Sequence, residues 1–246
     1  MTHSTQISQT SREFLDAVLK LRPRVAVFDC DGTLWENNSG EDFLEWSLQA
    51  GMVSEAVATG VRQRYTDYKE GRVGEEVMCG EMTTMYAGLK VTGLEAAARK
   101  FYAEVVRPNI FSEMLQLTRK LAENGCDLWA VSSTNEWVVR EGMREFGIIS
   151  SHVLAAAAEI EDGVVTERLK RMPSGEGKAL ALREAVLSRN ENRRIDVVFG
   201  NSVHDTAMLG MAKYAFAVNP NPDLEAQAKE RGWKIYWPER ITAVRM

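Results

Sequence analysis

Short apolar runs alternate with amphipathic segments along most of the chain. Four runs are rich in strand-forming residues and too brief for a helix, and they lie at 25–28, 128–131, 195–199 and 214–218. Apolar residues spaced three and four apart predict helices at 111–123, 135–146, 177–189 and 222–231. Buried strands that alternate with helices predict an α/β fold, a Rossmann-like doubly wound sheet of parallel strands.

A helix also precedes the first strand. Thr10 and Glu13 have the spacing of a capping box, and apolar residues follow them at helical intervals. Because proline cannot continue a helix, we expect this helix to end before Pro23.

About 100 residues separate the first strand from the second, which is too long for one crossover helix or a structureless loop. Four amphipathic patterns in this stretch predict four helices. Their apolar positions are Phe43, Leu44 and Leu48; Val57, Val61, Tyr65 and Tyr68; Val77, Met78, Met82, Met85 and Tyr86; and Leu94, Ala97, Phe101 and Val105. We therefore predict a helical cap domain at 40–107, inserted into an α/β core made of 1–39 and 108–246.

The composition is that of an ordinary globular protein. The 246 residues include 35 acidic and 30 basic side chains, a formal charge of −5 at pH 7, and 45% are hydrophobic. These proportions exclude an intrinsically disordered or collagen-like chain. A general nucleic-acid binder would need a basic face, so the acidic balance argues against a nucleic-acid partner.

The cysteine spacing and the hydropathy indicate the cellular compartment. The three cysteines, Cys30, Cys79 and Cys126, form no C-x-x-C pair, which is typical of reduced thiols rather than of a disulfide framework. Residues 1–24 contain no apolar run of the kind that a signal peptide needs, and no stretch approaches the roughly 18 apolar residues of a membrane span. We expect a cytoplasmic protein with no membrane partner.

The strongest chemical motif, D-C-D-G-T-L at 29–34, directly follows the first strand. Ligands of open α/β sheets bind at the carboxyl ends of the strands, where Asp29 and Asp31 would lie. Two carboxylates so close together repel each other unless a cation or a shared proton separates them. A turn held by local hydrogen bonds is the alternative explanation of these residues.

Three further polar groups occupy comparable places. The S-S-T run at 132–134 follows the second strand and offers donors to an anion, although such residues also simply cap helices. Lys178 begins a helix, where a solvated surface lysine is the simpler explanation. Asn201 and Asp205 follow the third strand. Together the four groups supply a nucleophile, a second acid, hydroxyls, a cation and metal-binding oxygens, an inventory that suits phosphoryl transfer.

The order of these motifs resembles the haloacid dehalogenase (HAD) superfamily, and the likeness extends from about residue 24 to about residue 220. The helical insertion resembles the α-helical cap of the phosphoserine-phosphatase-like branch. Residues 161–166, which read E-D-G-V-V-T, resemble the short hairpin of that branch.

The resemblance implies a phosphatase that hydrolyses a small phosphorylated metabolite through an aspartyl-phosphate, with Mg²⁺ as cofactor. Asp29 would be the nucleophile, and Asp31 the general acid and then the general base. Lys178 would offset charge beside Asp29, and it would hold the phosphoryl group together with Gly32, Thr33, Ser132 and Ser133. The metal would be bound by Asp29, Asp31, Asn201 and Asp205.

The chain departs from that branch at several positions. Asn201 replaces the usual aspartate of the fourth motif, so either it or Asp205 would ligate the metal directly. His204 stands where phosphoserine phosphatases carry asparagine; it is either a surface residue or part of the site. Phosphoserine phosphatases recognise their substrate with two charged residues. The corresponding positions of this chain are the uncharged Asn38 and Met82, which disfavours phosphoserine as the substrate.

Other residues of the insertion offer different recognition. Charged candidates are Glu36 and Glu41 for a cation, and Arg62, Arg64 and Arg72 for an anion, although charges on helices are commonly just solvated. An apolar face of Met82, Met85 and Tyr86 would favour a larger or less charged leaving group. A phosphotransferase or phosphomutase and a non-catalytic phospho-ligand binding protein remain as alternatives with the same motifs.

Overall fold

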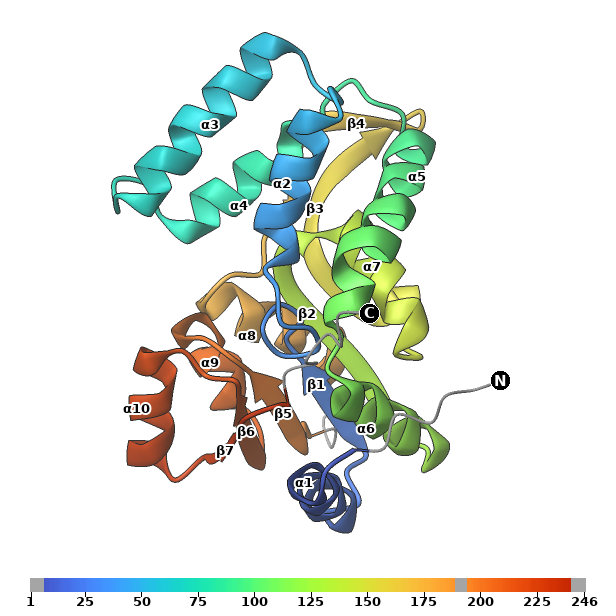
Figure 1. Ribbon diagram of the computed structural model, residues 1–246, viewed down its shortest axis with the longest axis vertical. Coiled ribbons are helices and arrows are strands. Elements are labelled where there is room, and N and C mark those ends of the chain that lie inside the picture. The colour runs from blue at the N-terminus through green and yellow to red at the C-terminus, as the bar shows by residue number, and fades with distance from the viewer. Residues whose placement is uncertain (1–6, 189–193, 240–246) are drawn as a thin grey trace, which may run out of the picture.

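One sheet of seven strands runs through the computed structural model, which describes residues 7–188 and 194–239 (Figure 1). The strand order is β4-β3-β2-β1-β5-β6-β7. The strands are β1 (Val25–Phe28), β2 (Asp127–Asn135), β3 (Val153–Glu161), β4 (Val164–Arg171), β5 (Val197–Gly200), β6 (Tyr214–Val218) and β7 (Lys234–Tyr236). Neighbouring strands are parallel except β3 and β4, which form an antiparallel hairpin at one edge.

The α-helices cover the sheet or lie beyond its carboxyl edge (Figure 1). They are α1 (Gln9–Lys20), α2 (Ser39–Gln49), α3 (Glu55–Lys69), α4 (Glu75–Thr84), α5 (Val91–Phe101), α6 (Ser112–Glu123), α7 (Glu136–Glu145), α8 (Glu176–Leu182), α9 (Thr206–Leu209) and α10 (Pro222–Arg231). Single π-helical turns extend α5 and α8. Within residues 7–188 and 194–239, none of the helices has the length and apolar character needed to cross a membrane.

Strand β1 is the centre of the sheet, with β2 on one side and β5 on the other. After β1 the chain builds β2 and β3 on the first side, and it later builds β5, β6 and β7 on the second. Ligands of such sheets bind at the carboxyl edge where the direction of winding changes. Asp29 lies at this point, and its N–H donates to the carbonyl oxygen of Phe199 (2.9 Å).

Apolar side chains bury both faces of the sheet. Ala26 and Phe28 of β1 belong to one hydrophobic cluster, and Val25 and Val27 belong to another on the opposite face. Helices α1, α5, α6 and α7 contribute to the first cluster, and α8, α9 and α10 to the second. Burial on both sides explains why an uninterrupted apolar run, rather than alternation, marks β1 in the sequence.

The inserted helices divide into two groups. Helices α2, α3 and α4 extend above the sheet in Figure 1 and enclose an apolar cluster of their own. Its buried members are Leu44, Leu48, Ala58, Val61, Val73 and Met78. Helix α5 instead joins the cluster of the sheet through Leu94 and Phe101. Main-chain bonds from Gly88 and Val91 to the β3–β4 hairpin fasten the insertion at its far end (both 2.9 Å).

The doubly wound sheet, the four helices between the first two strands and the hairpin at 161–166 are confirmed. The prediction for the first helix is wrong in detail, because the helix begins at Gln9 and the hydroxyl of Ser8, not of Thr10, accepts a capping N–H. The predicted helix at 177–189 begins as expected, but its last residue lies outside the described residues.

Strand boundaries account for the other differences. The S-S-T run at 132–134 continues β2 instead of opening a helix, and Asn135 caps α7. Strand β5 begins at Val197, because the carboxylate of Asp196 turns away to accept the N–H groups of Arg24 and Val25 (2.7 and 3.1 Å). Strands β3 and β7 are absent from the sequence prediction; β3 contains four consecutive alanines, which by themselves favour a helix.

Truncation of Phe199 is expected to destabilise the whole fold. Its buried ring stacks on Phe28 (4.6 Å between centroids) and on Phe216 (5.0 Å), across three adjacent strands. We expect Phe199→Ala to lower the free energy of unfolding by about 3–5 kcal/mol, as is usual for a buried phenylalanine. Denaturant unfolding checks this, with the exposed Leu180→Ala as control. A loss below about 1 kcal/mol would contradict the stacking argument.

Candidate active site

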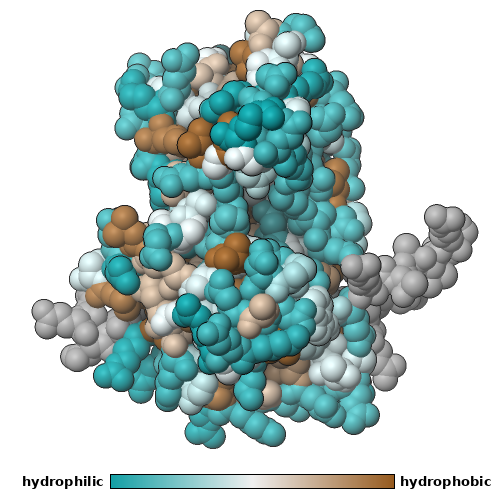
Figure 2. All heavy atoms as spheres, turned by 90° about the vertical axis from the view of Figure 1, so that its left-hand side faces the viewer, coloured by the Kyte–Doolittle hydropathy of each residue, from teal (hydrophilic) through white to brown (hydrophobic). Residues whose placement is uncertain are grey.

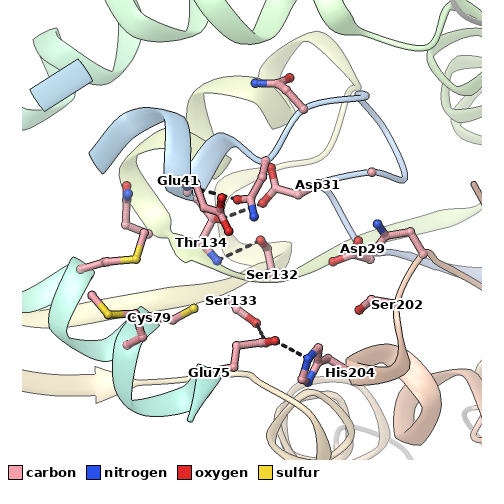
Figure 3. A pocket seen from close by; sticks show the side chains of 18 of the residues that line it. Asp29, Asp31, Glu41, Glu75, Cys79, Ser132, Ser133, Thr134, Ser202 and His204 are labelled. Carbon is pink, nitrogen blue, oxygen red and sulfur yellow. Dashed lines mark hydrogen bonds and ion pairs between the residues drawn. The ribbon is translucent and has the colours of Figure 1, made fainter. Parts of the chain in front are cut away.

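A cavity of about 390 Å³ lies between the carboxyl edge of the sheet and the inserted helices. The end of β2, the segments after β1, β5 and β6 and the start of α8 line it from the sheet side, and α2, α3 and α4 line it from the other side. In the space-filling view, the same face of the molecule is hollowed between its upper and lower parts (Figure 2). The close-up shows polar side chains that converge on the cavity from both sides (Figure 3).

Asp29 occupies the sheet side of the cavity and is almost fully buried. One carboxylate oxygen accepts from the ammonium of Lys178 (2.8 Å), and the other accepts from the hydroxyl of Thr33 (2.9 Å). Burial and the negative charge of Asp205 raise the pKa of Asp29 to about 7, although Lys178 opposes this shift. The carboxylate is therefore held in place and only partly compensated by positive charge.

Lys178 is the cation at the base of the site. Its ammonium is buried and donates to Asp205 (2.6 Å) as well as to Asp29, and these bonds raise its pKa against the effect of burial. The other Asp205 oxygen accepts the main-chain N–H groups of Asn201 and Ser202 (2.9 and 3.0 Å). Both oxygens of Asp205 are thus occupied, and the residue does not line the cavity.

Asp31 faces the cavity from the other side of the same turn. One of its oxygens accepts from the indole of Trp35 (2.7 Å) and from the N–H and hydroxyl of Ser39 (both 2.6 Å). The other accepts from the hydroxyl of Thr134 (2.7 Å), as Figure 3 shows. A hydroxyl can also accept a hydrogen bond, so Thr134 is compatible with Asp31 in either protonation state.

Gly32 allows the fourth motif to approach the first. Its φ is +72°, and a Cβ at this position would lie 1.9 Å from the amide nitrogen of Asn201. A side chain would therefore be strained in its backbone and would clash with Asn201. Because Gly32 has no side chain, the carboxamide of Asn201 can lie beside the turn that carries both aspartates.

The hydroxyls at the end of β2 have different partners. The hydroxyl of Ser132 accepts from the N–H of Thr134 (3.1 Å) at the buried end of the cavity. The hydroxyl of Ser133 donates to the carbonyl oxygen of Pro173 (3.1 Å) and lies 3.3 Å from the carboxylate of Glu75. Ser132 thus bonds to its own strand at the cavity, while Ser133 connects the sheet to the inserted helices.

Glu75, in the first turn of α4, fastens the inserted helices to the sheet at the mouth of the site. Its carboxylate accepts from the hydroxyl of Ser174 (2.8 Å) and pairs with the imidazole of His204 (2.5 Å). The hydrogen bond to Glu75 raises the pKa of His204, and the same bond with that from Ser174 lowers the pKa of Glu75 against burial. Figure 3 shows Glu75 between Ser133 and His204.

The wall of the cavity made by the inserted helices combines aromatic, thioether and acidic side chains. Its residues include Glu41, Tyr65, Tyr68, Met78, Cys79 and Met82, and Glu36 adds an acidic side chain from the segment before α2. Of the apolar face predicted for α4, Met82 lines the cavity, whereas Tyr86 is buried and bonds to Ser47 (2.9 Å). Asn38 lies at the rim, where its side chain caps α2 by accepting the N–H of Glu41.

None of the three arginines suggested by the sequence, Arg62, Arg64 and Arg72, lines the cavity. Arg64 forms an ion pair with Glu81 (2.6 Å), and Arg72 forms one with Asp67 (2.6 Å). Both arginines are well exposed to solvent. Their charges therefore stabilise the surface of the insertion and do not face a ligand.

The residues near Asp29 suit a hard cation. Asp29, Asp31 and Asn201 all line the cavity and can offer oxygen ligands with few charges, a set to which Mg²⁺ would add water and phosphate oxygens. Across residues 7–188 and 194–239, no three His, Cys, Asp or Glu side chains converge to hold a metal alone. The site therefore fits a cation bound together with a phosphate better than a closed protein cage.

The structure brings most of the predicted site residues to one cavity. Asp29, Asp31, Gly32, Ser132, Ser133, Lys178 and Asn201 line it, whereas Thr33 and Asp205 lie behind it and contact Asp29 and Lys178. Sequence reasoning missed Thr134, Ser39 and Glu75. Thr134 belongs to the S-S-T run, but nothing local indicates that its hydroxyl reaches Asp31.

Comparisons with known proteins agree with this arrangement. A family model described as haloacid dehalogenase-like hydrolase matches residues 26–210. The histidinol-phosphatase of Neisseria meningitidis serogroup C (strain 8013) is 27% identical over 217 residues, which cover 86% of this chain and 97% of that protein.

Two solved structures share the fold. A protein of unknown function from Bordetella pertussis Tohama I has a TM-score of 0.77 at 24% identity, covering 87% of this chain and 98% of that one. A substrate-bound phosphoserine phosphatase has a TM-score of 0.61 at 17% identity, covering 89% and 94%. Since the family match spans most of the sheet and the whole insertion, the resemblance seen in the motifs is confirmed: the chain belongs to the haloacid dehalogenase-like hydrolases.

Proposed function

We propose that the protein is a Mg²⁺-dependent phosphatase that hydrolyses a small phosphorylated metabolite through an aspartyl-phosphate on Asp29. One observation carries the proposal: the buried carboxylate of Asp29, held by Lys178 and Thr33, lines the same cavity as a second carboxylate, that of Asp31. Neither dehalogenation nor simple binding requires that second acid. Family membership and the phosphatase names of several relatives support the same reaction.

In the first step, a carboxylate oxygen of Asp29 forms a bond to phosphorus as the bond from phosphorus to the ester oxygen breaks. The leaving alkoxide takes a proton from the carboxyl group of Asp31. Ser132 and the ammonium of Lys178 interact with the phosphoryl oxygens while this occurs. Thr33 keeps the second oxygen of Asp29 turned away from phosphorus, because its hydroxyl donates to that oxygen.

In the second step, Asp31 removes a proton from a water molecule, which attacks phosphorus and releases inorganic phosphate from Asp29. The same residue thus gives and regains one proton. Its carboxylate is held in one orientation by Trp35 and Ser39, while Thr134 adapts to the change in protonation.

Asp29, the main chain of Asp31 and Asn201 would hold the Mg²⁺ ion. When bound, the ion would offset negative charge on the phosphate and the nucleophile. Asp205, which the sequence offered as a second candidate ligand, acts in this proposal through Lys178, because it bonds to that ammonium and, unlike Asp29, does not line the cavity. The buried ammonium then stays aligned with Asp29.

Residues 40–107 act in this proposal as the cap of a core formed by 1–39 and 108–246. Helices α2, α3 and α4 close the cavity from outside, and exclusion of bulk water protects the acyl phosphate until the second step. The contacts of Glu75 support this role, because they join α4 to three separate segments around the cavity. The name of the Neisseria relative favours a substrate other than phosphoserine, and so does the lack of arginine among the described residues that line the cavity.

The nucleophile can be tested directly. We expect Asp29→Asn to lower kcat by at least about 1,000-fold with Mg²⁺ and a panel of phosphomonoesters that includes histidinol phosphate and phosphoserine. Released phosphate and alcohol are both measured, because equal amounts distinguish hydrolysis from transfer to another acceptor. Asp16→Asn, on the exposed face of α1, is the control. If the wild-type protein hydrolyses no ester faster than Asp29→Asn does, the proposal is wrong.

Asn201 provides a test of the metal. We expect Asn201→Asp to reduce the Mg²⁺ concentration needed for half-maximal activity by about threefold or more, since a carboxylate adds charge to a ligand set of few charges. Titration of activity with Mg²⁺, at equal thermal stability of the two proteins, checks this. An unchanged Mg²⁺ requirement would place the ion away from Asn201.

Glu75 provides a test of closure. We expect Glu75→Gln to raise KM by about five- to tenfold with a smaller change in kcat, because it weakens the charged bond to His204 but contacts no reacting atom. Glu76→Gln, exposed on the same turn, is the matched control. Equal kinetics of the two variants would show that Glu75 does not hold the cap closed.

A further inference from the structure

The two sides of the cavity differ in charge. Among the described residues that line it, the basic ones are Lys178 and His204, and both belong to the sheet side, where they are paired with carboxylates. The wall made by α2, α3 and α4 contributes carboxylates and no arginine or lysine. The carboxylates of that wall, Glu41 and Glu75, are each paired with a cation, so the wall offers a leaving group that carries a carboxylate no positive charge of its own.

One part of this wall already contacts an ammonium group. Lys69, at the end of α3, places its Nζ 3.1 and 3.3 Å from the two carboxylate oxygens of Glu41. The same Nζ lies 5.3 Å from the ring centroid of Tyr65 and 5.9 Å from that of Tyr68. A carboxylate beside two aromatic faces is a common way of recognising an alkylammonium ion.

Lys69 reaches this cluster from the solvent side. Half of its side chain is exposed (54%), and it is not among the residues that line the cavity, whereas Glu41, Tyr65 and Tyr68 all are. An exposed ion pair of this kind contributes little stability, so an ammonium that arrives from the cavity can share or replace it at small cost. Figure 3 shows Glu41 on the same side of the cavity as Asp31, the proposed acid to the leaving group.

We propose that Glu41, Tyr65 and Tyr68 form an ammonium subsite, and that the substrates are phosphomonoesters of amino alcohols that lack a carboxylate. The subsite selects among esters whose phosphate lies at Asp29, so it rests on the proposed function. Charge on Glu41 attracts the amine, and the two rings replace part of its hydration. A carboxylate on the leaving group would compete with Glu41 for Lys69 instead of finding a cation on this wall, which disfavours phosphorylated hydroxy acids and amino acids.

Three matched series of esters test the substrate class with the full chain and Mg²⁺. The ω-aminoalkyl, ω-hydroxyalkyl and ω-carboxyalkyl phosphates of two to five carbons differ only in the charge of the terminal group. We expect kcat/KM to be highest for the amino series and lowest for the carboxy series, by about tenfold or more between the extremes. A preference for the carboxy series, or no difference among the three, would overturn the proposal.

Variants locate the effect. We expect Glu41→Gln to raise KM for the aminoalkyl esters by about tenfold and for the hydroxyalkyl esters by less than about twofold. Tyr65→Leu should raise KM in the same selective way by about threefold, since it removes one aromatic face. Glu45→Gln, exposed on the next turn of α2, is the matched control. An equal effect of Glu41→Gln on both series would overturn the subsite.

Lys69 separates the two roles that a cation at this place can have. Under our proposal Lys69→Met leaves KM for the aminoalkyl esters unchanged or lowers it, because a competing ammonium is removed. If Lys69 instead attracts an anionic leaving group, Lys69→Met raises KM for the carboxyalkyl esters, and the proposal is wrong.

Binding measurements distinguish failure of the subsite from failure of the proposed function. Calorimetry with Asp29→Asn should give tighter binding of aminoalkyl than of hydroxyalkyl phosphates. This preference would support the subsite even if the wild-type protein hydrolysed neither series. Hydrolysis that depends on Asp29 without any preference in rate or binding would leave the function intact and refute the subsite.

Discussion

The site depends on one buried ammonium between two carboxylates. Lys178 lies 2.8 Å from Asp29 and 2.6 Å from Asp205, and all three side chains are almost inaccessible to solvent. Removal of one member of such a buried set costs about 3–5 kcal/mol, because another charge is left unpaired. The three residues come from the turn after β1, from α8 and from the segment after β5, so the ion pairs also fix these elements relative to one another. Two carboxylates and one ammonium leave a net negative charge, which would favour binding of a cation beside Asp29.

The contacts of the insertion serve the cavity in a different way. Helix α5 packs into the core of the sheet and Phe43 of α2 joins the same core, whereas Leu44 and Leu48 of α2 form a small separate cluster with residues of α3 and α4. Glu75 adds an ion pair between α4 and His204, so the insertion meets the sheet side through both apolar packing and polar contacts. In our proposal the leaving group meets side chains of α2 and α3, while the reacting residues lie at the edge of the rigid sheet.

Much of the fold follows from the local pattern of apolar residues, and the elements that the sequence did not predict have identifiable physical causes. The strands β1, β5 and β6 and the helices α6, α7 and α10 match the prediction closely, since burial on one or two faces leaves a clear apolar signature. Strand β3 was missed because its alanines favour a helix in isolation and adopt a strand only between β2 and β4. The true N-cap, Ser8, lies two residues before the predicted one, and both are equally good caps by composition.

The sequence by itself determined the fold class, the family and most of the residues that gather near Asp29, because these depend on short motifs at the ends of strands whose edge is shared in any doubly wound sheet. Only the tertiary structure decided what each side chain faces. Asp205 proved to be the partner of Lys178, and Ser133 and His204 proved to be partners of Glu75. The acidic and aromatic wall around Glu41 is likewise invisible in the sequence, since helical spacing shows which residues share a helix face but not which face meets a cavity.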